Sequence, residues 1–348
     1  MQRTIPAPDR ARFDAIFARL EAQSQASFGT PGVRLETVGY EDRPFSWLCR
    51  AALKDNPAAA GRHVYVKIFK PKDPAAGIDL RARVRQDFAT TCEIHAFMAE
   101  WPELGAVRPI ACYDEALTIV TEEAEGTTLL DRLQRDATWF PDAARIDSLA
   151  RALETVGRWL KRFQGFRPAD DHVPIQSLVD YVDTRLKRLV DRQVMPASQR
   201  ERILGHLEAI GRGVSPHDLK DVAVHADLAP ANILVSDRGV VVLDFAMTGR
   251  GTALHDISRL YMQLDLLRAK PHFRQRVIAP LQEALLRGFD PALSPAHPLF
   301  RVLSMLHHVN HLGTLALRRE SLPGRLVSAR AIRMHRRWIA AQLDAGVR

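Results

Sequence analysis

The sequence predicts an α+β protein in which a small, strand-rich N-terminal part precedes a larger, mostly helical C-terminal part. Between residue 33 and Gly126, five short apolar stretches of strand character surround one stretch with helical spacing. After Gly126, apolar residues recur at helical spacing almost to the end, and one hairpin-like segment, "NILVSDRGVVVLDF", interrupts them. The length of 348 residues is enough for two core-bearing units.

The N-terminal part begins with a predicted helix over 8–28, in which Phe13, Ile16, Phe17 and Leu20 recur at helical spacing. The elements predicted after it are strands over 33–40, 45–53 and 63–69, a helix over 77–100, and strands over 107–114 and 117–126. The last strand leads into the second part, so we divide the chain into lobes of residues 1–122 and 123–348.

The C-terminal part contains the hairpin and eight predicted helices. These helices are expected over 127–135, 142–165, 176–192, 197–211, 253–268, 273–288, 298–317 and 325–343. Residues Ile233–Val235 and Val241–Leu243 form two apolar runs, and the turn signal "SDRG" lies between them.

Cysteine usage and hydropathy indicate the compartment. Cys49, Cys92 and Cys112 are odd in number and widely spaced, so we expect free thiols in a reducing environment. The sequence contains no apolar run of bilayer length and no N-terminal signal-peptide pattern. We therefore expect a cytoplasmic protein.

The net charge of +8 is compatible with nucleic acid, an anionic membrane surface or an acidic substrate. No zinc-finger spacing and no aromatic RNA-binding strand is present, so we expect no nucleic-acid partner. A basic solvated surface alone would also explain the charge.

Four polar residues stand within the hydrophobic hairpin region "VHADLAPANILV…VVVLDF". They are His225, Asp227, Asn232 and Asp244. An Asp- and Asn-rich turn with a satisfied histidine would be the structural explanation. Their order, however, resembles the catalytic loop H-x-D-L-x-x-x-N and the later metal-binding Asp-Phe pair of the protein-kinase-like fold.

This resemblance implies a bilobal fold with ATP and Mg²⁺ as cofactors. Asn232 and Asp244 would bind Mg²⁺, which prefers hard oxygen ligands. Asp227 would be the base beside the attacking hydroxyl, and His225 would be structural.

The N-terminal lobe contains candidates for the phosphate-binding pair of this fold. Lys67 in "VYVK" resembles the strand lysine of V-A-I-K, although an edge-strand lysine facing water is the alternative. We assign Glu93 as its partner, because the helical neighbours of Glu93 are apolar and should point inward. Asp87 neighbours threonines, which predicts a solvent-facing position.

The resemblance also implies a nucleotide-binding hinge. Its backbone contacts to adenine would come from Thr121, Glu122, Glu123 and Ala124. A glycine-rich phosphate loop is missing from "ETVGYEDRPFSWL", which offers Ser46 as a possible phosphate donor.

Three departures from protein kinases identify the branch. Ala226 replaces the usual Arg, Ala246 follows Asp-Phe, and no Ala-Pro-Glu motif precedes the next helix. This pattern resembles the aminoglycoside phosphotransferase and choline kinase family, in which a short loop leads to a helix that opens with an Asp like Asp256. The resemblance implies that Asp256 bonds the catalytic-loop backbone, and an ordinary acid in the first turn of a helix is the alternative. The resemblance implies an ATP- and Mg²⁺-dependent kinase of a hydroxyl on a small molecule or glycan. A non-catalytic nucleotide-binding pseudokinase and an aminoglycoside kinase are the alternatives.

The charge of the last part of the chain indicates which kind of acceptor the protein would bind. Residues 266–348 are rich in Arg and poor in acids, which disfavours a cationic aminoglycoside and favours an anionic acceptor. Arg330, Arg333 and Arg337 lie at i, i+3 and i+7, and we consider contact with substrate, with an anionic membrane surface or with water.

Histidines of "LHHVNHLG" form the last polar cluster. His307 and His311 have the i, i+4 spacing of a metal pair, but no third ligand is evident. Together with Asn310 they could bond sugar hydroxyls, and ordinary core or surface histidines are the alternative that we favour.

Overall fold

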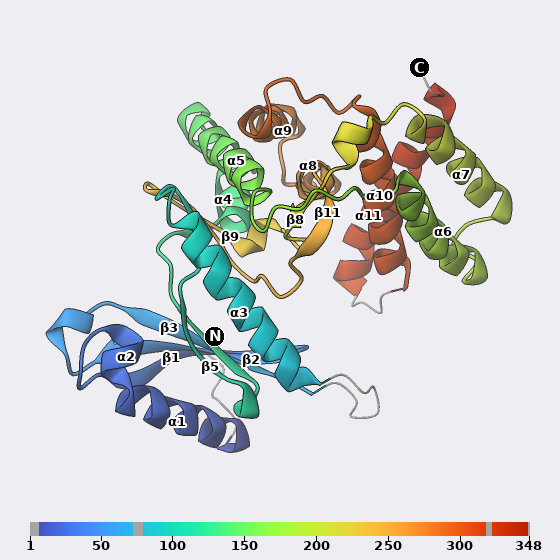
Figure 1. The fold of residues 1–348 in the computed structure, drawn as a ribbon. Helices are drawn as coiled ribbons and strands as arrows, with labels where there is room; N and C mark the ends of the chain where they lie inside the picture. Colours follow the sequence, from blue (N-terminus) through green and yellow to red (C-terminus); the bar gives the residue numbers. More distant parts are fainter. Residues whose placement is uncertain (1–6, 72–78, 318–321, 347–348) are drawn as a thin grey trace. The chain divides into compact units, whose positions relative to one another are not determined.

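The computed structural model divides the chain into two compact units (Figure 1). The residues that it describes are 7–71, 79–317 and 322–346. The first unit contains the chain up to Gly126 together with Val241–Ala246, and the second contains Thr127–Val240 and the chain from Met247 onward. The first is strand-rich and the second mostly helical, which confirms the predicted α+β class.

A five-stranded antiparallel sheet forms the centre of the first unit, in the order β1-β2-β3-β6-β5. Its strands are β1 (Arg34–Arg43), β2 (Ser46–Lys54), β3 (His63–Phe69), β5 (Pro109–Tyr113) and β6 (Thr118–Glu122). The sequence predicted all five strands. The neighbouring short strand β4 (Leu104–Ala106) was not predicted, and Val107 beyond it donates to the carbonyl of Val242 at 3.0 Å.

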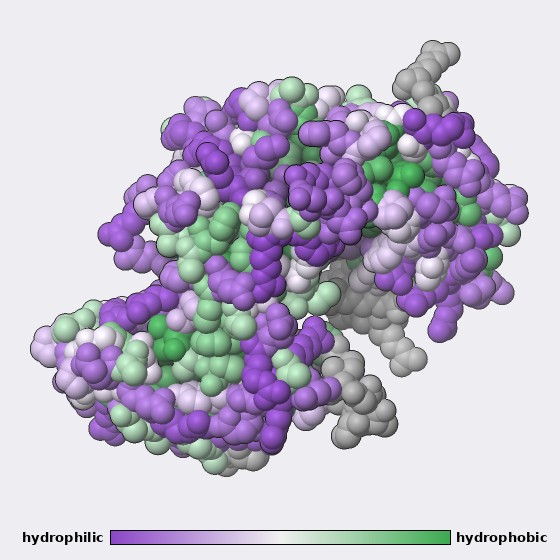
Figure 2. Space-filling model, viewed as in Figure 1, coloured by the Kyte–Doolittle hydropathy of each residue, from purple (hydrophilic) through white to green (hydrophobic). Residues whose placement is uncertain are grey.

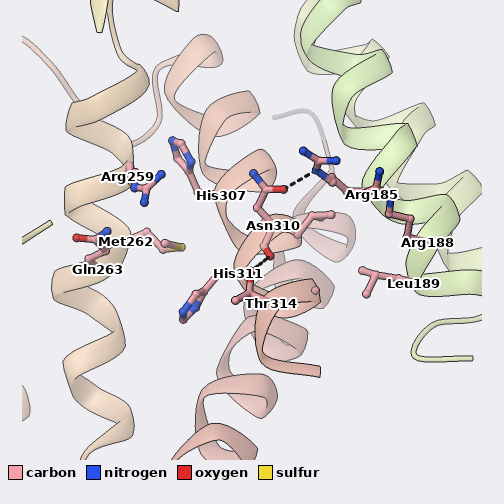
Figure 3. Close-up of a pocket in the computed structure, with 12 residues that line it drawn as sticks. Arg185, Arg188, Leu189, Arg259, Met262, Gln263, His307, Asn310, His311 and Thr314 are labelled. Atoms are coloured by element: carbon pink, nitrogen blue, oxygen red, sulfur yellow. Dashed lines mark hydrogen bonds between the residues drawn. The ribbon is translucent and has the colours of Figure 1, made fainter. Parts of the chain in front are cut away.

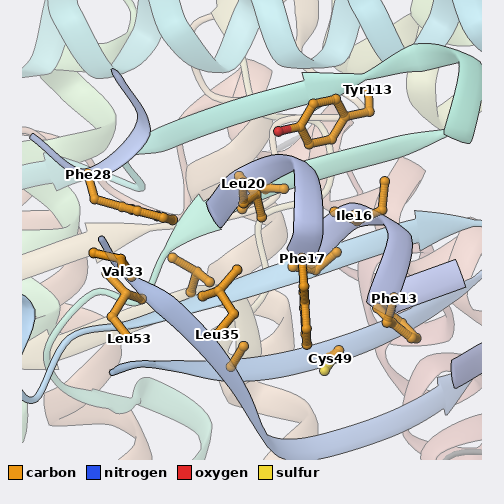
Figure 4. Close-up of a cluster of buried hydrophobic side chains, with 14 of the residues drawn as sticks. Phe13, Ile16, Phe17, Leu20, Phe28, Val33, Leu35, Cys49, Leu53 and Tyr113 are labelled. Carbon is orange, nitrogen blue, oxygen red and sulfur yellow. The ribbon is translucent and has the colours of Figure 1, made fainter. Parts of the chain in front are cut away.

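Alternation along β3 separates the hydrophobic core from the polar face of the sheet. Val64, Val66 and Ile68 are buried in the core that α1 (Ala7–Ala22) and α2 (Ser24–Phe28) cover (Figure 4). Because successive side chains point to opposite faces of a strand, Lys67 lies on the other face. β3 is a central strand, so the alternative of an edge-strand lysine is wrong.

The N-terminal helix prediction over 8–28 is correct in extent but not in continuity. The structure has two helices there, and the second ends at Gly29, whose φ of 74° lies in the left-handed region that favours glycine. Phe13, Ile16, Phe17 and Leu20 point from α1 into the core, as the spacing predicted (Figure 4).

Helix α3 (Leu80–Met98) completes the first unit. Asp79 caps its first turn by accepting hydrogen bonds from the backbone N–H groups of Arg81 and Ala82. Its buried residues Val84, Thr91, Ile94 and Met98 recur at i, i+7, i+10 and i+14 and form one stripe.

Helices dominate the second unit, and every predicted one is present. They are α4 (Leu129–Asp136), α5 (Ala143–Phe163), α6 (Ile175–Asp191), α7 (Ala197–Gly211), α8 (His255–Asp265), α9 (Gln275–Phe289), α10 (Pro298–Leu317) and α11 (Leu322–Ala345). Helices α5 and α9 approach closely at two glycines: a Cβ on Gly288 would lie 1.9 Å from the carbonyl oxygen of Glu154, and one on Gly157 would lie 2.3 Å from that of Leu285.

Short strands frame the loop region of the second unit. The predicted hairpin is formed by β9 (Ile233–Ser236) and β10 (Gly239–Val242), and β7 (Thr127–Thr128) pairs with β9. Two further strands, β8 (Asp221–Val224) and β11 (Gly249–Thr252), pair with each other. The sequence analysis missed this pair, because "GRGT" has neither the length nor the β-branched content that marks a strand.

Hydrophilic side chains predominate on the face of the molecule in Figure 2, and hydrophobic ones form separate patches. Among the described residues, no helix combines the length and hydropathy needed to cross a membrane. The three cysteines are free thiols, as predicted.

The histidines of α10 contact other histidines and backbone: His307 and His308 are buried and His311 is half-buried. His307 Nε2 lies 3.0 Å from the His255 carbonyl oxygen, and His335 on α11 lies between His308 and His311, with N···N distances of 2.9 and 2.7 Å. Within the described part of the chain, no group of three or more His, Cys, Asp or Glu residues could hold a metal ion.

Burial should make these histidines a source of acid sensitivity. Desolvation lowers the pKa of His307, His308 and His311, and lowers that of His335 to about 3. In the unfolded chain a histidine titrates near pH 6.5, so below that pH the unfolded state binds protons that the folded state does not. Below pH 6.5 the free energy of unfolding should therefore decrease as the pH is lowered. The decrease should be about 1.4 kcal/mol per pH unit for each histidine that stays neutral in the folded state.

Urea unfolding at pH 7, 6 and 5 measures this slope. The His335→Gln variant lacks one of the titrating groups, so its stability should fall less steeply over the same range. A wild-type stability that is constant from pH 7 to pH 5 would contradict the expectation.

Candidate active site

The predicted catalytic loop follows β8 and turns at Pro230–Asn232 into β9. The side chain of Asp227 is 52% exposed. The side-chain Nδ2 of Asn232 donates to the backbone carbonyl of Asp227 at 3.3 Å, and this hydrogen bond holds the two ends of the loop together. The amide oxygen of Asn232 is not used in this bond.

Asp256, in the first turn of α8, anchors the loop. Its carboxylate is 5% exposed and accepts hydrogen bonds from the backbone N–H of His225 at 2.6 Å and of Ala226 at 3.0 Å. These contacts confirm the predicted bond between Asp256 and the loop backbone. Burial raises the pKa of Asp256, but hydrogen bonds and charges from His255 and His225 outweigh it, and the net pKa is lowered.

The anchored backbone has an uncommon conformation. Ala226 has a φ of 61°, which is in the left-handed region that non-glycine residues rarely adopt. Such a conformation costs of order 1–3 kcal/mol and persists only where its surroundings impose it. His225, next to it, is fully buried, as expected of a structural residue.

Arg259 lies one helical turn after Asp256 and also contacts the loop. Its Nη1 donates to the Ala226 carbonyl at 2.7 Å and its Nη2 to Asp227 Oδ1 at 2.6 Å. The sequence analysis did not single out Arg259. The signal was its i+3 spacing from Asp256 on the same helix, which places both side chains on one face.

Lys67 and Asp244 form an ion pair within the first unit, with 3.1 Å between Nζ and Oδ1. Asp244 follows β10, has a φ of 62° and keeps a side chain that is 41% exposed. The structure therefore brings the predicted phosphate-binding lysine to the predicted metal-binding carboxylate.

The prediction that Glu93 points inward is wrong, because Glu93 is exposed. The buried stripe of α3 passes through Asp87, which the sequence analysis had placed on the solvent face. Burial raises the pKa of Asp87 to about 6, while the charge of Lys67 lowers it and that of Asp244 raises it. Asp87 is thus a carboxylate of α3 whose pKa the charge of Lys67 lowers.

Threonines caused this error. Thr90 and Thr91 were taken as a sign of solvent, but both are buried. The Thr91 hydroxyl donates to the backbone carbonyl of Asp87 at 2.8 Å, so its burial leaves no unsatisfied polar group.

The predicted hinge continues β6, and its backbone takes part in the sheet. The N–H groups of Glu122 and Glu123 donate to the carbonyls of Arg108 and His63, each at 2.9 Å. The Glu123 carboxylate also binds Arg50 through two hydrogen bonds of 2.7 Å. An adenine at Thr121–Ala124 would therefore use backbone groups other than these two N–H groups.

Ser46 is the first residue of β2 and is only 4% exposed. The hairpin between β1 and β2 has only Pro44 and Phe45 between the strands, so no open loop presents the Ser46 hydroxyl. The structure does not support the prediction that Ser46 contacts a phosphate.

Comparison with known families accounts for this combination of loop, ion pair and helix anchor. A model described as the phosphotransferase enzyme family matches residues 59–299, which include the catalytic loop, Lys67, Asp244 and Asp256. The chain belongs to this family. Its members include small-molecule phosphotransferases that act on hydroxyl groups. A search of curated proteins found no match.

Solved structures of low sequence identity share the fold of this chain. A choline/ethanolamine kinase family protein from Mesorhizobium loti is 14% identical with a TM-score of 0.56, over 96% of this chain and 98% of the other. Choline kinase from Cryptosporidium parvum is 12% identical with a TM-score of 0.57, over 95% and 97%.

A thermostable mutant of the aminoglycoside phosphotransferase APH(4)-Ia, in a ternary complex with ADP and hygromycin B, is also similar. It is 16% identical with a TM-score of 0.52, over 94% of this chain and 97% of the other. At these identities the comparisons show the kinase-like fold.

Proposed function

We propose that this phosphotransferase transfers the γ-phosphoryl group of ATP, with Mg²⁺, to a hydroxyl of a small-molecule or glycan acceptor. The main observation in support of the proposal is the conformation of the loop that contains Asp227. Asp227 is an accessible carboxylate on a loop that the buried Asp256 and the amide of Asn232 hold in an uncommon conformation.

Asp227 is assigned as the base. It would accept the proton of the acceptor hydroxyl as that oxygen bonds to the γ-phosphorus and ADP leaves. Arg259 binds one oxygen of this carboxylate and keeps the side chain in place. His225 supports the loop through its backbone and its complete burial.

Asn232 and Asp244 are assigned to Mg²⁺. Both supply the hard oxygen donors that this ion prefers, and Asp244 is accessible. Mg²⁺ would neutralise charge on the phosphate oxygens, and Lys67 would contribute a further positive charge to them. The hinge residues Thr121–Ala124 are assigned to the base of the nucleotide. For the partner of Lys67 we propose Asp87 in place of Glu93.

Two alternatives are less well supported. A pseudokinase commonly lacks one of the residues required for catalysis, whereas Lys67, Asp227, Asn232 and Asp244 are all present. An aminoglycoside acceptor is polycationic, and the arginine-rich C-terminal region would repel it. We therefore propose an anionic or sugar acceptor.

Thermal shift with ATP, GTP and Mg²⁺ tests the proposal first, because a ligand that binds the folded state raises its stability by mass action. A screen of acidic, neutral and cationic acceptors follows. No stabilisation by any Mg²⁺–nucleotide would contradict the proposed activity.

Asp244→Ala is expected to weaken Mg²⁺–ATP binding, because it removes a metal ligand and the anionic partner of Lys67. Calorimetric titration with Mg²⁺–ATP measures the change. Asp114→Ala is the matched control, since Asp114 is an acid of the same unit whose ion-pair partner is Arg85. Equal nucleotide affinity in the two variants would remove Asp244 from the metal site.

A further inference from the structure

A cavity of about 490 Å³ lies among α6, α8 and α10 of the second unit (Figure 3). This volume is in the range of small-molecule sites. Its polar lining comes from Arg185 and Arg188 of α6, Arg259 and Gln263 of α8, and His307, Asn310, His311 and Thr314 of α10.

All charged side chains that line this cavity are positive. Three arginines line it, and no carboxylate is among its lining residues. Burial lowers the pKa of His307 and of His311, and the nearby charge of Arg259 lowers both further, so these histidines are neutral at pH 7. The arginines therefore determine the electrostatic potential of the cavity.

Two of the three arginines lack an acidic partner among the described residues. Arg185 donates to the Asn310 side-chain oxygen at 3.1 Å and to the Tyr181 hydroxyl at 3.1 Å, and both partners are neutral side chains. Asn310 donates in turn to the same hydroxyl at 3.0 Å. This network holds the Arg185 guanidinium at the cavity without neutralising it. Arg188 is exposed one turn further along α6.

The cavity is next to the catalytic loop. Its wall residue Arg259 binds Asp227 Oδ1, and Gln263, one turn later on α8, donates to the Leu228 carbonyl at 3.3 Å. A ligand in the cavity would thus lie beside the proposed base.

We propose that this cavity binds the acceptor through an oxyanion group, a carboxylate or a phosphate monoester, held by Arg185 and Arg188. Guanidinium groups bind such oxyanions through paired, charge-assisted hydrogen bonds. Arg259 lines the same cavity and binds Asp227 Oδ1. The inference rests on the proposed function and specifies its acceptor class.

The proposal assigns the binding groups to α6 and not to the C-terminal helix α11. Arg330, Arg333 and Arg337 are exposed on α11, and none of them lines the cavity. The sequence analysis considered them for substrate contact, because it could not place α6 beside α10.

Calorimetric titration of the nucleotide-free full chain with inorganic phosphate and with glycerate tests the inference. Glycerol and a polycationic aminoglycoside are the neutral and cationic probes. The two anions should bind more tightly than either of them. The double variant Arg185→Gln/Arg188→Gln should raise the anion Kd by about tenfold or more, since it removes charge-assisted hydrogen bonds.

The double variant Arg330→Gln/Arg333→Gln is the matched control, because it removes the same charge from exposed positions outside the cavity. Its Kd should change by less than about twofold, since exposed distant charges are screened. Equal losses in both double variants, or an unchanged Kd in the cavity variant, would overturn the inference.

Asn310→Asp provides a test without loss of an arginine. It places a carboxylate beside Arg185 and should weaken anion binding while keeping the side-chain volume. These readouts require no nucleotide, so a chain that fails to bind ATP would overturn the proposed function and leave the anion result interpretable. Transfer to an anionic acceptor with an unaltered KM in the Arg185→Gln/Arg188→Gln variant would overturn the inference alone.

Discussion

Replacing Asp227 with Asn is expected to reduce phosphoryl transfer by about 10²–10⁴-fold, the usual loss when a general base is removed. An amide cannot accept the proton of the acceptor hydroxyl at neutral pH. It can still accept the hydrogen bond that Arg259 Nη2 donates to Asp227 Oδ1, so the loop should remain in place. Mg²⁺–ATP binding should change little, because Asp227 acts on the acceptor.

Steady-state kinetics with an acceptor from the screen, together with calorimetric titration of Mg²⁺–ATP, separates the two effects. Asp237→Asn is a matched control, since Asp237 lies in the turn between β9 and β10 and has no assigned role. Turnover close to wild type in the Asp227→Asn variant would remove Asp227 from the role of base, and a parallel loss of nucleotide affinity would indicate a collapsed loop.

Strand alternation and motif order were predictable from the sequence, because both depend on local spacing. Val64, Val66 and Ile68 alternate with Lys67, so one face of β3 had to be the core and the other had to carry the lysine. The contact of Asp256 with the loop was predicted by family resemblance and is present.

Residue polarity failed as a guide to the buried face of α3. Thr90 and Thr91 satisfy their hydroxyls within the helix and can therefore be buried. The face of α3 that carries them and Asp87 thus points inward, and Glu93 points outward.

The predicted phosphate contact of Ser46 was not supported for a different reason. A two-residue turn was not distinguishable from a longer loop in "YEDRPFS".

Contacts between segments far apart in the sequence could not be predicted from the spacing of residues. The assignment of Val241–Ala246 to the first unit depends on pairing over more than a hundred residues, as in the bond from Val107 to Val242. The arginine-lined cavity likewise depends on how α6, α8 and α10 are rotated against one another. The excess of arginine was visible in the sequence, but the identity of the arginines that share a site was not.

Asp256→Asn is expected to impair both folding stability and transfer, although the side chains have nearly the same shape. The two carboxylate oxygens each accept one backbone N–H, from His225 and from Ala226. An Asn side chain has one oxygen, so its NH₂ group must face one of these N–H donors. A buried donor left without a partner costs about 1–3 kcal/mol, and we expect the free energy of unfolding to fall by that amount.

Transfer should fall with it, because the left-handed conformation of Ala226 depends on the same two bonds and positions Asp227. Urea unfolding and kcat are the measurements. Asp265→Asn on the same helix is the control: Asp265 binds Arg268 in a half-buried i, i+3 pair, and its loss should cost less than about 1 kcal/mol. Equal stability of the two variants, or a kcat for Asp256→Asn that matches the control, would show that the loop keeps its conformation without the carboxylate.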